Sequence, residues 1–237
     1  MRIKESENSI KKVAKITGIL YLIMFIAAPL SAMVFLKGIV VPGDAAATAG
    51  NILAHDGLFR LGIMSNLSVQ VLHIFLVVFL YRLLKSVDKS QAILLMVLGL
   101  AGVPIAMLNE LNQFAPLLLL SGPDYLTVFK ADQLNAMANV FLNLHQQGIM
   151  IAQIFWGLWL FPLGTLVFKS GYIPKILGIL LIIGGIGYIT DVITVFAFPN
   201  LGVTISMFTF WGEVILPLWL LIKGVNVEKW RNTLEAN

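Results

Sequence analysis

The stretch LGIMSNLSVQVLHIFLVVFLYRLL, residues 61–84, decides the fold of this chain. No Asp, Glu, Lys or Arg occurs in it before Arg82. A helix that crosses a bilayer needs about 20 predominantly apolar residues. The stretch is therefore predicted to be a transmembrane helix, and the few polar residues within it are expected to face protein rather than lipid.

Five further stretches have the same apolar character and length. They lie near residues 16–36, 91–112, 147–168, 173–198 and 201–222. With 59% hydrophobic and 12% charged residues, the chain is far too apolar for an ordinary soluble domain. The sequence predicts an all-α fold, a polytopic membrane bundle of six transmembrane helices that forms a single membrane domain, residues 1–237.

The positive charges are sorted between the connecting segments. If the amino terminus is inside, only Lys37, Arg60 and Lys130 of the 16 Lys and Arg residues fall in outer segments. This asymmetry predicts that both termini are cytoplasmic and that the protein is a multi-pass protein of a cytoplasmic membrane. The net charge of +4 needs no nucleic-acid partner, because attraction to the lipid bilayer explains charges in short flanking loops.

Two segments between the spans are predicted to be helical at the outer face. The first covers 45–55 and begins after Asp44, a good helix-capping residue. The second covers 114–143, and its first part is too short to cross the bilayer. The following span either continues from this segment and projects outward or breaks near Gly148, and Pro162 predicts a bend within it.

Polar residues recur at helical spacing inside the spans. In the 61–84 helix, Asn66, Gln70 and His73 share one face. Ionisable groups near the middle of a span cost about 2.5–3.5 kcal/mol each on insertion scales, so they tend to face the bundle interior. Later in the chain, Tyr188 and Asp191 share a face, Thr209 and Glu213 share another, and Gln146 belongs to a polar stripe. Glu110 and His145 are further candidates, near the outer ends of their spans.

Counting from the helix ends places these residues in the outer halves or the middle of the spans, whereas the inner halves are apolar. The leading hypothesis is a polar chamber that opens outward, with His73, Asp191 and Glu213 as its main ligand-binding residues. The chamber would bind or transport a small polar ligand, a lipid headgroup or a cation. A homodimer would enlarge the small bundle for transport.

Each candidate also has a structural explanation. Asn, Gln, Ser and Thr in spans often only join helices, at about 0.6 kcal/mol per hydrogen bond. Glu110 at the outer end of its span can lie at headgroup level, where a carboxylate needs no special role. His73, Asp191 and Glu213 are harder to explain in this way, because three ionisable groups at depth are costly.

Two alternatives use the same residues. In a metal-dependent intramembrane hydrolase, His73, Asp191 and Glu213 would be the ligands, although no local ligand spacing supports this. A haem held by His73 and His145 is not favoured, because the two lie at different depths. Besides the ligand-binding and hydrolase hypotheses, the sequence leaves open a non-catalytic accessory or sensory protein. With no cysteine, Cys-based metal sites and thiol chemistry are excluded, and the residues identify no cofactor.

Several segments together resemble a known family. They are ITGILYL (16–22), DGLFRLG (56–62), NELNQ (109–113) and FWGEVILPLW (210–219). The chain resembles a bacterial multi-pass membrane-protein family catalogued only as a domain of unknown function. The resemblance covers nearly the whole chain and implies a multi-pass protein of a prokaryotic cell membrane, but no reaction and no site residues.

Overall fold

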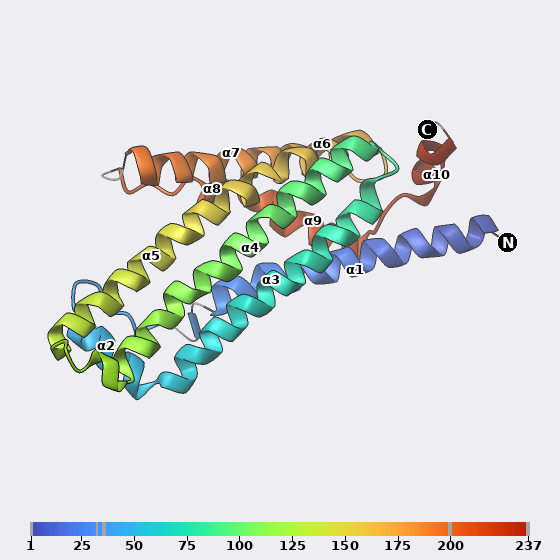
Figure 1. The fold of residues 1–237 in the computed structure, drawn as a ribbon. Coiled ribbons are helices and arrows are strands. Elements are labelled where there is room, and N and C mark those ends of the chain that lie inside the picture. The colour runs from blue at the N-terminus through green and yellow to red at the C-terminus, as the bar shows by residue number, and fades with distance from the viewer. Residues whose placement is uncertain (1, 32, 35–36, 199–200, 236–237) are drawn as a thin grey trace. The chain divides into compact units, whose positions relative to one another are not determined.

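The computed structural model describes residues 2–31, 33–34, 37–198 and 201–235, and Figure 1 labels their helices. No strand occurs in these ranges. The α-helices are α1 (Arg2–Ser31), α2 (Ala45–Ala54), α3 (Asp56–Leu84), α4 (Lys89–Leu120), α5 (Ala131–Leu158), α6 (Leu160–Ser170), α7 (Lys175–Ala197), α8 (Ser206–Thr209), α9 (Trp211–Ile222) and α10 (Val227–Glu235). A short 3₁₀ helix covers Asp124–Leu126. The predicted all-α fold is confirmed.

Within the described residues, five helical segments are long and apolar enough to cross a membrane. They are Glu7–Ser31, Asp56–Leu84, Lys89–Leu120, Ala131–Ser170 and Lys175–Ala197. Three of the five contain one of the predicted spans and extend beyond it at one end or both. The first, Glu7–Ser31, covers only the beginning of the predicted 16–36, of which residues 32, 35 and 36 lie outside the described residues. The fifth, α7, matches the predicted 173–198 to within two residues. The chain thus has the helices of a multi-pass membrane protein.

The sixth predicted span, 201–222, is shorter than expected. Helices α8 and α9 together run from Ser206 to Ile222, slightly less than the roughly 20 residues of a full span. They reach the length of a span only if α10 is counted with them, and α10 is bent away by 101°. The segment VEKWRNTLE of α10 is amphipathic, with Trp230 buried, so it suits the edge of the bundle better than hydrocarbon.

The outer segment 114–143 is not one unit. Residues 114–120 continue α4 without a break, so a single helix covers both the predicted span and the short apolar run. Pro116 lies inside this helix, where it removes one backbone donor without ending the helix. The remainder of the segment contains the 3₁₀ turn and the first turns of α5. The other predicted outer helix is present as α2, and Asp44 caps it by accepting a hydrogen bond from the Ala47 amide at 2.8 Å.

Helix α5 passes through Gly148 without interruption, so the helix continues from the outer segment into the span. The interruption comes at Trp159, between α5 and α6. Pro162 explains it, since a proline at this position cannot donate to the carbonyl of Leu158 and its ring crowds that carbonyl. The helix is thus interrupted three residues before Pro162, and Ala131–Ser170 remains a single apolar segment.

The chain divides into two compact units. Unit 1 contains residues 1–25, 72–103 and 151–237, and unit 2 contains residues 26–71 and 104–150. The core of unit 1 is a continuous apolar cluster in which Trp159, Tyr21 and Leu163 are almost fully buried. The core of unit 2 is smaller and gathers around Phe59, Ile52 and Leu117.

In unit 1, α6 and α7 pack at very short range, and two glycines make this contact possible. A Cβ atom at Gly164 would lie 2.6 Å from the carbonyl oxygen of Gly178. A Cβ atom at Gly178 would lie 2.5 Å from the carbonyl oxygen of Gly164. Small residues at both positions let two transmembrane backbones approach closely, which increases their van der Waals attraction.

Candidate functional site

The polar face of α3 contributes to both units. Asn66 and Gln70 belong to unit 2, and His73 belongs to unit 1. Gln70 and His73 are buried, and Asn66 is partly buried. The helical spacing that puts these residues on one face therefore does not assign them to one site. Each is described below with the unit that contains it.

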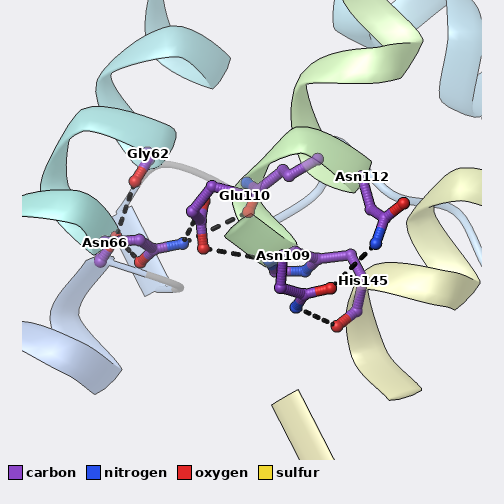
Figure 2. A network of polar contacts seen from close by, with 8 residues as sticks. Gly62, Asn66, Asn109, Glu110, Asn112 and His145 are labelled. Carbon is purple, nitrogen blue, oxygen red and sulfur yellow. Dashed lines mark hydrogen bonds and ion pairs between the residues drawn. The ribbon is translucent and has the colours of Figure 1, made fainter. Parts of the chain in front are cut away.

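The most connected polar group of unit 2 is the acid–histidine cluster, which consists of Ser31, Asn66, Asn109, Glu110, Gln113 and His145. Its centre is the contact between Glu110 Oε1 and His145 Nε2, 3.1 Å apart (Figure 2). The two side chains are only 10% and 9% exposed. They come from α4 and α5, so tertiary packing is needed to create the pair.

Asn66 extends the cluster on the other side of Glu110. Its Nδ2 atom donates to Glu110 Oε2 at 3.4 Å and to Gln113 Oε1 at 3.3 Å. The hydroxyl of Ser31 donates to Asn66 Oδ1 at 3.0 Å. Both carboxylate oxygens of Glu110 therefore have a partner, and the Asn66 amide faces the carboxylate in Figure 2.

Asn109 fixes the position of α5. Its Nδ2 atom donates to the backbone carbonyl of His145 at 2.7 Å, and its Oδ1 atom accepts from Asn112 at 3.0 Å (Figure 2). Gly148 leaves the space for this amide, because a Cβ atom at that position would overlap the Asn109 side chain. The glycine in α5 thus has a specific packing role in setting the position of His145.

One donor in the cluster has no acceptor among the described residues. Gln113 is 1% exposed, and its Nε2 atom has no hydrogen-bond partner. A buried donor without a partner costs about 1–3 kcal/mol. The cluster therefore combines a carboxylate–imidazole pair, which can hold or pass a proton, with an amide group able to donate to an additional oxygen.

A groove of about 390 Å³ lies beside the cluster, within unit 2. Glu110 contributes to its wall, so the acid of the cluster lies next to the groove. The remaining lining residues are Arg60, Ile63, Met64, Leu67, Met107, Leu111 and Phe114. The groove gives an external molecule a route to the Glu110 side chain.

Unit 1 has a second buried carboxylate. The hydroxyl of Tyr21 donates to Glu213 Oε1 at 2.8 Å, and Tyr188 also interacts with this carboxylate. Tyr21 is fully buried and Glu213 is 6% exposed. Glu213 lies in the first turn of α9, where the positive end of the helix dipole favours a carboxylate. We refer to Tyr21, Tyr188 and Glu213 as the tyrosine–glutamate group.

Aromatic ring contacts bring His73 near the tyrosine–glutamate group. Its ring centroid is 4.9 Å from that of Trp159, which in turn is 5.9 Å from that of Tyr21. The backbone of Gly99 is the polar group that faces the imidazole. The ring is therefore held mainly by packing, and no carboxylate is among its described contacts.

Asp191 has a structural partner. Its two oxygens accept hydrogen bonds from the backbone amides of Ile205 and Ser206, and the second of these bonds is 3.0 Å long. These amides lie at the start of α8 and would otherwise lack an acceptor. Asp191 thus ties α7 to the beginning of the broken α8–α9 helix.

Two other predicted residues lie apart from these groups. Thr209 turns back to the carbonyls of Ile205 and Ser206, at 3.4 and 3.5 Å. Gln146 is exposed, although its neighbour His145 is buried. Further along α5, Gln153 also joins a neighbouring helix, since it donates to the Tyr188 carbonyl at 3.3 Å.

The three residues of the metal alternative have three different environments. Glu213 is bound to Tyr21, Asp191 to two backbone amides, and His73 packs on Trp159. Over the described part of the chain, no group of three or more His, Cys, Asp or Glu residues is arranged to hold a metal ion. The metal alternative thus has no ligand group on which a mechanism can be built.

Four members of the two polar groups were not predicted as site residues: Ser31, Asn109, Gln113 and Tyr21. Tyr21 follows an apolar run in which nothing distinguishes it from an interfacial aromatic residue. Gln113 lies three residues after Glu110, a helical spacing that does put both on one face. The spacing from Glu110 could therefore have identified Gln113 from the sequence. Tyr21 is identified only by its contact with Glu213 in the tertiary structure.

Comparisons with known proteins identify the family of this chain. An uncharacterized protein of Archaeoglobus fulgidus is 50% identical over 74 residues, which are 31% of this chain and 44% of that protein. The aligned part thus spans less than half of the relative. No solved structure matches the chain. Residues 16–224 match one family model, which confirms the resemblance seen in the sequence, and the chain belongs to the family described as Domain of unknown function (DUF4386).

Proposed function

We propose that this protein binds a small polar ligand or a lipid headgroup inside the membrane, at the acid–histidine cluster. The observation that supports this most directly is the position of Glu110, which is bound to His145 and also lines an open groove. Joining two helices with a carboxylate and an imidazole costs more free energy in a membrane than joining them with neutral amides, so a purely structural role does not explain the pair.

The cluster has the chemistry that such a ligand needs. Glu110 offers acceptor oxygens, and His145 offers a donor or an acceptor according to its protonation. The amide of Gln113 is a buried donor that still lacks an acceptor. A ligand with a hydroxyl or amine next to an oxygen would satisfy all three kinds of group.

The distribution of cations supports an outward orientation of the cluster. Unit 2 contains Lys37, Arg60 and Lys130 as its only Lys and Arg residues, and all the others belong to unit 1. Under the positive-inside rule, the segments of unit 2 that connect helices are the outer ones. The proposed site therefore opens to the outer side of a prokaryotic cytoplasmic membrane.

Transport is the form of this function to test first. Glu213, bound to Tyr21 in unit 1, is a buried carboxylate that could couple transport to protons. If proton coupling uses it, Glu213→Gln abolishes ligand uptake into proteoliposomes without abolishing ligand binding. Uptake that is unaffected by this substitution would remove Glu213 from the mechanism.

Binding is tested by native mass spectrometry of the full chain in detergent, with an extract of prokaryotic polar lipids and metabolites as the probe. We expect a discrete bound mass that is lost in Glu110→Gln and in His145→Gln. Glu213→Gln serves as the matched control, because it also neutralises a buried carboxylate but lies outside the cluster. An adduct pattern that is the same in all four proteins would refute the proposal.

A further inference from the structure

The groove beside the acid–histidine cluster has a cation at one end and a long apolar wall. We propose that it is a phospholipid site, in which the phosphate of a membrane lipid pairs with Arg60 and one acyl chain lies along the wall. This inference does not depend on the function proposed above, since it uses Arg60 and the apolar residues and not the Glu110–His145 pair.

The groove is built by matching faces of two helices. On each helix the lining residues follow the spacing i, i+3, i+4 and i+7, which defines one face. They are Arg60, Ile63, Met64 and Leu67 on α3, and Met107, Glu110, Leu111 and Phe114 on α4. Seven residues of helix correspond to about 10 Å, so the wall is long enough for a substantial part of an acyl chain.

Arg60 is suited to a phosphate. Its side chain is 50% exposed, and its Nε atom donates to Asp56 at 2.8 Å. The two terminal amino groups have no hydrogen-bond partner among the described residues. A guanidinium that keeps one side for a carboxylate can still bind phosphate oxygens through its other donors.

The position of Arg60 is also fixed. Its guanidinium lies over the ring of Phe114, 5.9 Å from the ring centroid, so it stays at the mouth of the apolar wall. The residues at the other end of the wall, Leu67 and Met107, are apolar. A cation at one end and a purely apolar far end give the polarity of a lipid, with its phosphate at Arg60 and its chain directed away.

The other charged residue of the groove does not compete for the phosphate. Both oxygens of Glu110 already have partners in the cluster, His145 and Asn66. A lipophilic cation would have to share Glu110 with these two partners, whereas a phosphate needs only the unoccupied donors of Arg60. The arrangement therefore favours an anionic headgroup.

The test is native mass spectrometry of the full chain in detergent with three separate probes: dioleoylphosphatidylglycerol, dioleoylglycerol and inorganic phosphate. We expect the phospholipid to bind at least about ten-fold more tightly than dioleoylglycerol, because only the phospholipid can form charge-assisted hydrogen bonds. We also expect Arg60→Gln to remove most of this difference. Equal affinity for the two lipids, or inorganic phosphate binding as tightly as the phospholipid, would overturn the proposal.

The chain offers a matched control at the other end of α3. Arg82 also lies over an aromatic ring, that of Phe79 at 5.4 Å, but it does not line the groove. Arg82→Gln is expected to leave binding unchanged, and a loss equal to that in Arg60→Gln would show a general effect of basic charge. Leu67→Trp, which fills the groove and keeps Arg60, should weaken phospholipid binding, and unchanged binding in this variant would contradict the role of the acyl chain.

Discussion

The acid–histidine cluster and the tyrosine–glutamate group both bury a carboxylate inside a helical membrane protein, but they satisfy it differently. Glu110 is bound to an imidazole and an amide and lies beside an open groove. Glu213 is bound to a phenol, at the start of a helix and within a large aromatic core. Glu110 is thus placed for exchange with a ligand, whereas the partners of Glu213 are part of the packing itself.

Glu110 and Glu213 are both buried, but only Glu110 lines an open groove. Sequence reasoning ranks buried ionisable residues by depth, and by that measure Glu213 ranks above Glu110. Yet a side chain acts on a ligand only where something can approach it. Asp191 shows the limit of the same reasoning, because its carboxylate is already used by two backbone amides at the start of α8.

The largest effect is expected from removing the acid of the cluster. Glu110→Ala takes a partner from both His145 and Asn66, and breaking a buried pair costs about 3–5 kcal/mol. Glu213→Gln keeps a side-chain oxygen that accepts from Tyr21 and Tyr188, so bonds to a charged group become neutral ones at about 1 kcal/mol each. Thermal unfolding of both variants in detergent checks this order, and a larger loss for Glu213→Gln would reverse the comparison.

A smaller effect is expected from the helix packing that holds His145. Gly148→Ala forces the new methyl group against the Asn109 side chain, and overpacking of this kind costs about 1–3 kcal/mol. Gly50→Ala in α2 is the control, because a Cβ atom there meets open space and alanine suits a helix. If both variants unfold at the wild-type temperature, Gly148 has no role in positioning α5.

The third prediction compares two buried hydroxyls. Tyr21 donates to a carboxylate and Thr17 to the carbonyl of Val13, both at 2.8 Å. Bonds to charged groups are worth about 1.5–3 kcal/mol and neutral ones about 0.5–1.5 kcal/mol. Tyr21→Phe should therefore lower the free energy of unfolding more than Thr17→Val. Equal losses would indicate that Glu213 carries no charge in the folded protein.

The smallest effect on stability is expected at Arg60. Its ion pair with Asp56 is exposed, and such pairs contribute little. Arg60→Gln should leave the unfolding temperature of the delipidated protein unchanged and lower it only when phosphatidylglycerol is present. Destabilisation of the same size with and without the lipid would mean that Arg60 has a structural role.

Much of the fold could be predicted from hydropathy, because the length of a membrane helix is set by the thickness of the bilayer. The helix interruption near Pro162 and the cap at Asp44 have local causes that the sequence reveals, a missing donor and a nearby acceptor. The continuation of α4 through residues 114–120 could not, since a helix that extends beyond hydrocarbon follows no hydropathy limit. The late start of the α8–α9 segment at Ser206 depends on Asp191, which lies on another helix.

For the candidate site, the sequence alone determined which residues are chemically unusual, among them Glu110, His145, His73, Asp191 and Glu213. It could do so because charge in an apolar stretch is costly wherever the helix packs. Only the tertiary structure decided which of them meet: Glu110 with His145, Glu213 with Tyr21, and Asp191 with backbone amides. Helical periodicity fixes the face on which a residue lies, but the partner across that face is set by how separate helices pack.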